Sequence, residues 1–303
     1  MVAEAGDDAD LGRALARRLI VVAAVCVALA AFTYLLMVRT HLGQRFDNAA
    51  LIGSQRQSTS SRVHDYFFLE RIHAATFAAV LLVIAGIGLI RRRPRLGIAI
   101  AGGALLAVAG TDLAKYDILT RPYLVATDAI RKNNTFPSGH TATAIACALA
   151  LVVISPPAAR GLVAILAGSY SWVVAADVQT AGWHRPSDAI GAAFLAFATI
   201  AVVAALLAWR RPVGTGRRTS HWVAYPVLGL VGILSASLTA LNATRGLRIL
   251  ARTADAPIPP RSAVLGDAYR FSVNLTVFVV VVLLIVLLLL LDNRDLDQPI
   301  RTQ

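Results

Sequence analysis

Three short polar patches interrupt a chain that is otherwise mostly apolar. They begin at Lys115, Pro137 and His184, and each lies at the end of an apolar run. Ionisable residues are costly at membrane depth, so their presence there usually marks a site of chemistry. Together the patches hold cations, two histidines, a serine, a glycine and a carboxylate. Such a set is suited to binding a phosphate group and removing it by attack of an imidazole.

The two histidines take different roles in this interpretation. His184 is the predicted nucleophile, and Asp188 follows four residues later. Within a helix, that spacing brings a carboxylate toward the imidazole and can fix its tautomer. His140 is the predicted acid that protonates the leaving oxygen. A metal site of both histidines and Asp188 is the alternative. Because the charges of Lys115 and Arg121 would repel a cation, we expect neither a metal nor another cofactor.

Phosphate binding is assigned to the remaining polar residues. Lys115 and Arg121 would neutralise the phosphate, Arg121 in bidentate fashion. Ser138 is the expected N-cap of a helix whose first turn holds Gly139, and Ser187 is expected to cap another helix in the same way. Free N–H groups at a helix N-terminus bind anions, and Gly139 lets the backbone approach an oxyanion closely.

The composition is that of a polytopic membrane protein. Of 303 residues, 57% are hydrophobic and 15% charged, and the mean hydropathy is +0.66. We predict an all-α membrane bundle of eight spans, at about 19–38, 74–90, 96–113, 140–154, 161–176, 189–209, 223–241 and 271–291. Several spans are shorter than the ~20 residues that cross the hydrocarbon. These short spans border the polar patches, so we expect them to end inside a cavity.

All three patches fall among spans three to six. We therefore expect a cytoplasmic tail over 1–18, a six-span core over 19–210, and a remainder over 211–303 with an inner loop, a two-span extension and a C-terminal tail. The extension carries no comparable motif. The outer loops from about 39 to 72 and from 242 to 270 are long enough to fold over the site opening. Both a lid and a solvated connector fit such loops.

The net charge of +12 does not predict a nucleic-acid partner, because the arginines are spread over loops. Basic residues are denser in the shorter loops on one side, such as 91–95. The positive-inside rule then places both termini in the cytoplasm and the patches outside. The Ala/Arg/Val-rich composition suggests a bacterial protein, so we expect it in the inner membrane of the cell. The expected partners are a lipid phosphate substrate and membrane lipids. The oligomeric state is not predicted.

The patches resemble those of the type 2 phosphatidic acid phosphatase family, which shares its site with vanadium haloperoxidases and bacterial non-specific acid phosphatases. That family has a Lys followed by Arg-Pro, a Pro-Ser-Gly-His, and a Ser-Arg followed by His and Asp. The second motif matches at residues 137–140, and the end of the third matches at His184 and Asp188. Over about 74–209, the resemblance implies a six-helix membrane core, a phosphohistidine on His184 and no metal.

The chain departs from the family pattern at two places. The spacing from Lys115 to Arg121 is one residue shorter than usual. Asp177 and Val178 stand where the family has Ser-Arg, so a phosphate-binding arginine is absent from that position. The candidates to replace it are Arg131, Lys132, Arg185 and Gln179.

The leading hypothesis is hydrolysis of a membrane lipid phosphate or diphosphate at the outer face. Polyprenyl phosphates and diphosphates, phosphatidylglycerophosphate and phosphatidate all suit the site, with a slight preference for the polyprenyl class. A lipid phosphotransferase would use the same intermediate. A non-catalytic lipid-binding protein is the third alternative, and the missing arginine is its main support.

Overall fold

The computed structural model describes residues 2–55, 59–125, 133–210, 213–215, 222–246, 263–292 and 294–296. Within them, α-helices, two π-helices and one pair of two-residue strands make up the fold. The elements are α1 (Val2–Thr33), η1 (Tyr34–Val38), α2 (His41–Ser54), α3 (Thr59–Leu69), α4 (Ala74–Ile90), α5 (Pro94–Leu113), η2 (Ala114–Ile118), α6 (Gly139–Ile154), α7 (Pro157–Thr180), α8 (Pro186–Arg210), β1 (Gly214–Thr215), α9 (Ala224–Gly246), α11 (Ala263–Leu290) and β2 (Arg294–Asp295).

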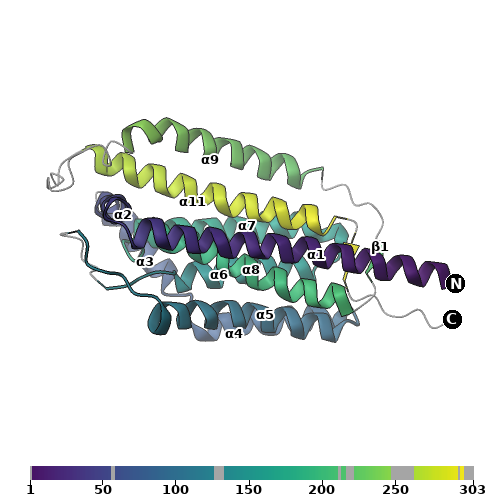
Figure 1. Ribbon diagram of the computed structural model, residues 1–303. Coiled ribbons are helices and arrows are strands. Elements are labelled where there is room, and N and C mark those ends of the chain that lie inside the picture. Colours follow the sequence, from purple (N-terminus) through teal and green to yellow (C-terminus); the bar gives the residue numbers. More distant parts are fainter. Residues whose placement is uncertain are drawn as a thin grey trace.

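The long helices run side by side along one axis (Figure 1). α8 lies at the centre, where it packs against α1, α5 and α6, while α9 and α11 pack against each other and α11 also contacts α7 and α2. We call the end that holds α2 and α3 the site end. The opposite end, where β1 pairs antiparallel with β2, is the strand end.

Small residues make the centre of the bundle. On α8, Ala193, Ala196, Ala201 and Ala204 are each at most 1% exposed. Small side chains let helix backbones approach closely, which is how helices commonly associate in membranes. α8 can therefore pack against several helices at once and present its N-terminus to all of them at the site end.

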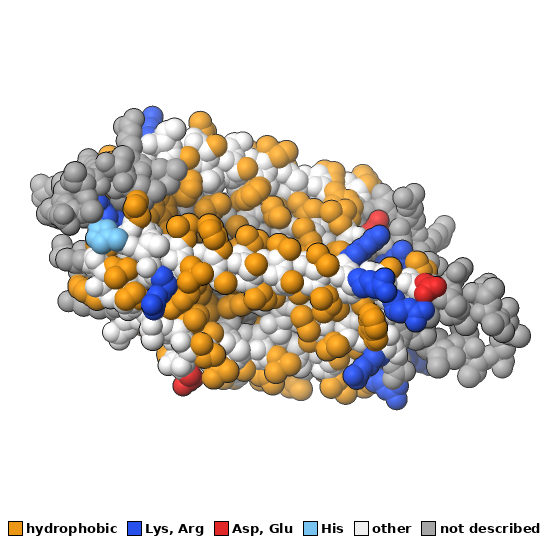
Figure 2. Space-filling view, in the orientation of Figure 1, with side chains coloured by type: hydrophobic (Ala, Val, Ile, Leu, Met, Phe, Trp, Pro, Cys, Tyr) orange, Lys and Arg blue, Asp and Glu red, His pale blue; other side chains and the backbone are white. Residues whose placement is uncertain are grey.

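The outside of the bundle is apolar. Exposed side chains include Leu82 at 73%, Ile90 at 84% and Leu166 at 62%. Hydrophobic side chains cover the middle of the face shown in Figure 2, and most of its basic side chains gather toward the strand end. A soluble monomer rarely exposes so much contiguous apolar surface. The predicted all-α membrane bundle is confirmed.

All eight predicted spans are helices, but not all are long enough to cross a membrane alone. Among the described residues, six helices are long and apolar enough to cross a membrane. A seventh span results if α4 is joined to residues 63–69 of α3 across a 55° bend. α6 has 16 residues and is too short. Its N-terminus lies at the site, as expected for a span that ends inside a cavity.

The first predicted outer loop is not a solvated connector. It contains α2 and α3, and most residues of α2 are buried. α2 packs against α8 and α11, so it belongs to the site end of the bundle. In the second outer loop, residues 247–262 lie outside the described residues.

Candidate active site

A cavity of about 480 Å³ opens at the site end. Each of the three predicted patches contributes to its wall, through Lys115, Gly139, His140 and His184. The full lining is Tyr66, Ile72, Val108, Asp112, Lys115, Tyr116, Gly139, His140, Thr143, Trp183 and His184. The fold therefore brings the three patches together, although Lys115 and His184 are 69 positions apart in the chain.

His184 and Asp188 form the imidazole–carboxylate pair that their spacing predicts. His184 Nδ1 lies 3.3 Å from Asp188 Oδ2, and the same oxygen accepts a hydrogen bond of 2.8 Å from the backbone N–H of Arg185. Asp188 is fully buried and His184 is 6% exposed. With its Nδ1 proton directed at Asp188, the imidazole keeps a lone pair on Nε2 for a reaction in the cavity.

His140 stands in the first turn of α6, held by aromatic neighbours. Its ring contacts Trp183 at 5.1 Å between centroids, and Trp183 contacts Tyr66 at 5.2 Å. Ser138 caps α6 as predicted, since its Oγ accepts a hydrogen bond from the backbone N–H of Thr141 at 3.3 Å. The Ser138 N–H donates to the carbonyl of Asp188 at 2.9 Å, so the N-termini of α6 and α8 are joined.

Lys115 leaves the end of α5 within η2, and its Nζ lies 5.0 Å from the ring centre of Tyr116. Asp112, one turn earlier, also lines the cavity. A Cβ at Gly139 would lie 3.4 Å from Asp112 Oδ1, at ordinary van der Waals distance, so the two residues are neighbours in the cavity wall. Asp112 is not among the sequence-predicted residues, although its spacing of three from Lys115 is a usable signal.

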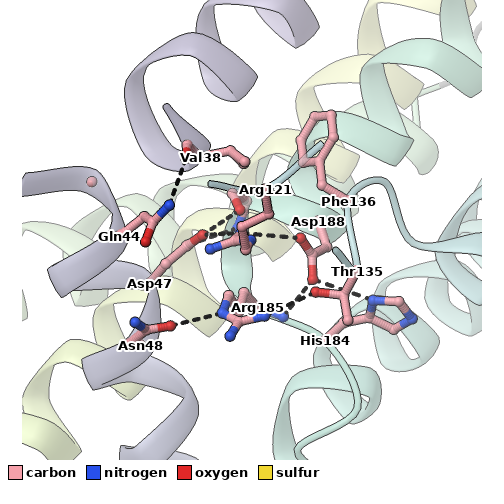
Figure 3. A network of polar contacts seen from close by, with 12 residues as sticks. Val38, Gln44, Asp47, Asn48, Arg121, Thr135, Phe136, His184, Arg185 and Asp188 are labelled. Atoms are coloured by element: carbon pink, nitrogen blue, oxygen red, sulfur yellow. Dashed lines mark hydrogen bonds and ion pairs between the residues drawn. The ribbon is translucent and has the colours of Figure 1, made fainter. Parts of the chain in front are cut away.

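Arg121 does not line this cavity. Its side chain is 4% exposed, and its Nη2 lies 3.0 Å from Asp47 Oδ2 and 3.7 Å from Asp188 Oδ1 (Figure 3). Its Nε and Nη1 have no hydrogen-bond partner among the described residues, which leaves donors for an anion. Phosphate binding by Arg121 and by the fully buried Ser138 stays a prediction.

Arg185 and Ser187 also point away from the cavity. Arg185 donates from Nε to Asn48 Oδ1 at 2.9 Å and from Nη1 to Thr135 Oγ1 at 3.1 Å. The prediction that Ser187 caps α8 is wrong, because the helix begins one residue earlier, at Pro186. Proline suits the first helical position, where its missing N–H is not needed. The Ser187 hydroxyl instead donates to Asp47 Oδ2 at 2.5 Å.

Val178, at the position of the missing family arginine, is a core residue. It is fully buried in an apolar cluster and is absent from the cavity wall; the cluster contains Leu69, Ala144, Val174, Val178 and Ala189. Gln179 faces α11, where its Nε2 donates to Thr276 Oγ1 at 3.0 Å. Arg131 and Lys132 lie outside the described residues.

Sequence reasoning missed the contribution of α2. Asp47 is fully buried and bonded to Arg121 and Ser187, and Asn48 is bonded to Arg185. Burial raises the pKa of the Asp47 carboxyl, against the pull of the nearby Arg121 guanidinium. The spacing of Gln44, Asp47 and Asn48, all polar, is that of one helix face. That pattern, read in the first outer loop, would have indicated a buried polar helix face.

The metal alternative has no geometric support. Within the part of the chain that the structure describes, no three His, Cys, Asp or Glu side chains are grouped so that they could hold a metal ion. The described site therefore consists of an imidazole paired with a carboxylate, a second imidazole and a lysine around one cavity.

Comparison with known proteins gives one match. The family model described as the PAP2 superfamily matches residues 99–212, which includes all three patches. Neither the curated proteins nor the solved structures contain a match. The PAP2 superfamily is a phosphatase family, so the match supports phosphatase activity on a phosphate substrate. The match over residues 99–212 is consistent with the type 2 phosphatidic acid phosphatase family that the motifs resemble.

Proposed function

We propose that this protein hydrolyses a membrane lipid phosphate or diphosphate through a phosphohistidine on His184. The observation that carries the proposal is the cavity at the ends of apolar helices, where His184, paired with Asp188, and His140 share one wall with Lys115. A substrate whose tail stays in lipid could place its phosphate in such a cavity. The slight preference for a polyprenyl substrate rests on the predicted outward orientation.

The chemistry follows from the two imidazoles. His184 Nε2 attacks the phosphorus, and the bond from phosphorus to the leaving oxygen breaks while His140 donates a proton to that oxygen. Asp188 stabilises the positive charge that develops on His184. Water then attacks the phosphohistidine and gives a proton to His140. Phosphate leaves, and both histidines return to their starting states.

Phosphate release from a panel of lipid phosphates tests the proposal. We expect the wild type to release phosphate and His184→Ala to lose turnover while it still folds, since His184 stands at a polar helix end. The activity should persist in EDTA and be inhibited by vanadate, a five-coordinate phosphate mimic. His184→Ala that retains more than a few per cent of wild-type activity would exclude the nucleophile assignment. Product formation that depends on an alcohol acceptor would favour a phosphotransferase.

The outward orientation has its own test. A cysteine introduced at Gln57 or Thr253 should react with an impermeant thiol reagent added outside the cell, and one at Gly214 should not. The native Cys26 and Cys147 lie within helices and are replaced first. The reverse labelling pattern would place the cavity in the cytoplasm and would require a different substrate pool.

A further inference from the structure

α2 lies outside the PAP2 match but carries buried polar residues toward the site. Within this helix, Gln44, Arg45, Asp47 and Asn48 are at most 5% exposed. Burying polar and charged side chains is costly unless they find partners. A helix that only closed the end of the bundle would not need them.

Asp47 contacts two parts of the site at once. Its Oδ2 lies 3.0 Å from Arg121 Nη2 and accepts a 2.5 Å hydrogen bond from the Ser187 hydroxyl. Its Oδ1 accepts a hydrogen bond of 3.3 Å from the Ser187 backbone N–H. Ser187 precedes Asp188 in the first turn of α8, so Asp47 holds the turn that carries the carboxylate of the catalytic pair (Figure 3).

Arg121 connects the two carboxylates. The same Nη2 that contacts Asp47 lies 3.7 Å from Asp188 Oδ1. Asp47 therefore shares the Arg121 guanidinium with Asp188. Arg121 lies closer to Asp47, and this contact keeps it at the longer distance from Asp188. Asp188 Oδ2 contacts His184 Nδ1 at 3.3 Å and accepts a hydrogen bond from the Arg185 backbone N–H at 2.8 Å.

The last helix fixes α2 in place. Phe46 packs edge-on against Phe271 of α11, with 5.5 Å between ring centres. A Cβ at Gly53 would lie only 2.1 Å from the backbone oxygen of Leu265, so α2 and α11 are in direct backbone contact. An apolar cluster of Phe46, Ala49, Ala50, Leu265 and Ala268 fills the interface. This contact ties the C-terminal extension, which carries no motif of its own, to the site.

We propose that Asp47 is a positioning residue of the active site, acting through Arg121 and Ser187, and that α11 holds α2 so that Asp47 can act. The inference rests on the proposed function. Without the Asp47 charge, Asp188 is the one anionic partner left to Arg121 among the described residues, and Arg121 moves closer to it. Asp188 then stabilises the positive charge on His184 less well. Attack by His184 slows, while the groups that line the cavity remain.

The test measures kcat, KM and the pH profile of kcat/KM for Asp47→Asn, which keeps the size of the side chain and removes its charge. We expect kcat to fall by about 10- to 100-fold, as for a partly weakened catalytic electrostatic interaction, and KM to change less than kcat. The acid limb of the pH profile should move to lower pH by up to about one unit, because His184 is protonated less easily.

The pH readout depends on the charges around His184. Asp112, Lys115 and His140 line the cavity with it, Asp188 is its direct partner, and Arg121 stands beyond Asp188. Of these five groups, Arg121 is the one that contacts Asp47 directly. A general loosening of the bundle would lower the amount of folded protein but would not move the acid limb of the pH profile to lower pH.

Two further variants complete the experiment. Ser187→Ala removes the hydroxyl contact alone and should give a smaller loss of kcat than Asp47→Asn, and it serves as the test if Asp47→Asn does not fold. Phe271→Ala should lower kcat by a few-fold through α2. The matched control is Asp267→Asn, a carboxylate 8% exposed that pairs with Arg270 on α11 and should leave kcat and the acid limb unchanged.

The outcomes separate the two proposals. A wild type that releases no phosphate would overturn the proposed function, and this inference with it. If the wild type is active and depends on His184, while Asp47→Asn and Ser187→Ala both match it in kcat and acid limb, the positioning role is wrong. Increased activity in Asp47→Asn would also overturn the positioning role, because it would mean that Asp47 of the wild type competes with the substrate for Arg121.

Discussion

Two ionic clusters lie at opposite ends of the bundle, and they differ in charge balance. In the site-end cluster, two carboxylates, Asp47 and Asp188, share the guanidinium of Arg121. The neighbouring guanidinium of Arg185 donates to Asn48 and Thr135. The strand-end cluster sets one carboxylate among three guanidiniums: Asp295 Oδ1 lies 2.5 Å from Arg93, 3.3 Å from Arg91 and 3.8 Å from Arg160. Of the two clusters, the site-end cluster is the one in which an imidazole, that of His184, contacts a carboxylate, that of Asp188.

The donors of the strand-end arginines bind backbone carbonyls at the end of α6 and in the segment that follows α11. Arg160 donates to the oxygen of Leu291 at 3.0 Å, Arg93 to that of Leu296 at 2.9 Å, and Arg91 to that of Ile154, the last residue of α6. Cations near helix C-termini satisfy orphan carbonyls and complement the helix dipole. This cluster anchors the segment after α11 to the core.

Helix direction explains the contrast. Asp188 stands in the first turn of α8 and its carbonyl accepts a hydrogen bond at the start of α6, so the carboxylates meet helix N-termini. Burial is costly at both ends: it raises the pKa of Asp47 and lowers that of Arg91. The strand end compensates that cost with contacts to backbone carbonyls and to Asp295. The site end compensates it with a network that also orients His184, which makes it the end suited to chemistry.

Neutralising one carboxylate at each end tests this contrast most strongly. Asp188→Asn should lower kcat by about 10³- to 10⁴-fold, because the His184 tautomer and its developing charge lose their partner. Asp295→Asn should leave kcat per folded molecule within about two-fold and lower the melting temperature by several degrees, since breaking a buried ion pair costs about 3–5 kcal/mol. Both are measured on purified protein, by phosphate release and thermal unfolding. A comparable loss of kcat in Asp295→Asn would contradict the division of roles.

A comparison of two leaving groups tests the assignment of His140 as the general acid of the site. His140→Ala should lower kcat/KM by about 10²- to 10⁴-fold on a lipid phosphate, whose alkoxide needs a proton to leave. The loss should be smaller on an activated aryl phosphate, whose leaving group is acidic. Parallel assays of one enzyme preparation on both substrates measure the difference. Equal losses would remove His140 from the role of general acid.

The smallest expected effect concerns the carboxylate inside the cavity. Asp112 faces the space into which the phosphate would bind, so Asp112→Asn should lower KM by about three- to ten-fold by removing a like charge. Asp117→Asn is the control, since Asp117 lies on η2 but does not line the cavity. A raised KM in Asp112→Asn would show that the substrate needs this carboxylate.

Features that depend on near neighbours in the chain could be predicted from the sequence. Apolar runs determined the helices because burial and membrane contact act on whole segments. The Pro-Ser-Gly-His motif determined the capped start of α6, and the spacing of His184 and Asp188 determined their pairing, because both are set within one or two helical turns. The family resemblance rested on these same local motifs.

The tertiary structure alone decided where the arginines point. Arg121 follows a family motif that predicts a phosphate ligand, yet it pairs with Asp47, which lies 74 positions earlier. Ser187, predicted to cap α8, donates to the same Asp47 across 140 positions. Val178 stands where the family has a phosphate-binding arginine, and it is a core residue in the apolar cluster. The reason is that a long buried side chain turns toward whichever partner removes its desolvation cost. The packing of α2 against α11, α8 and η1 brings that partner, Asp47, within reach.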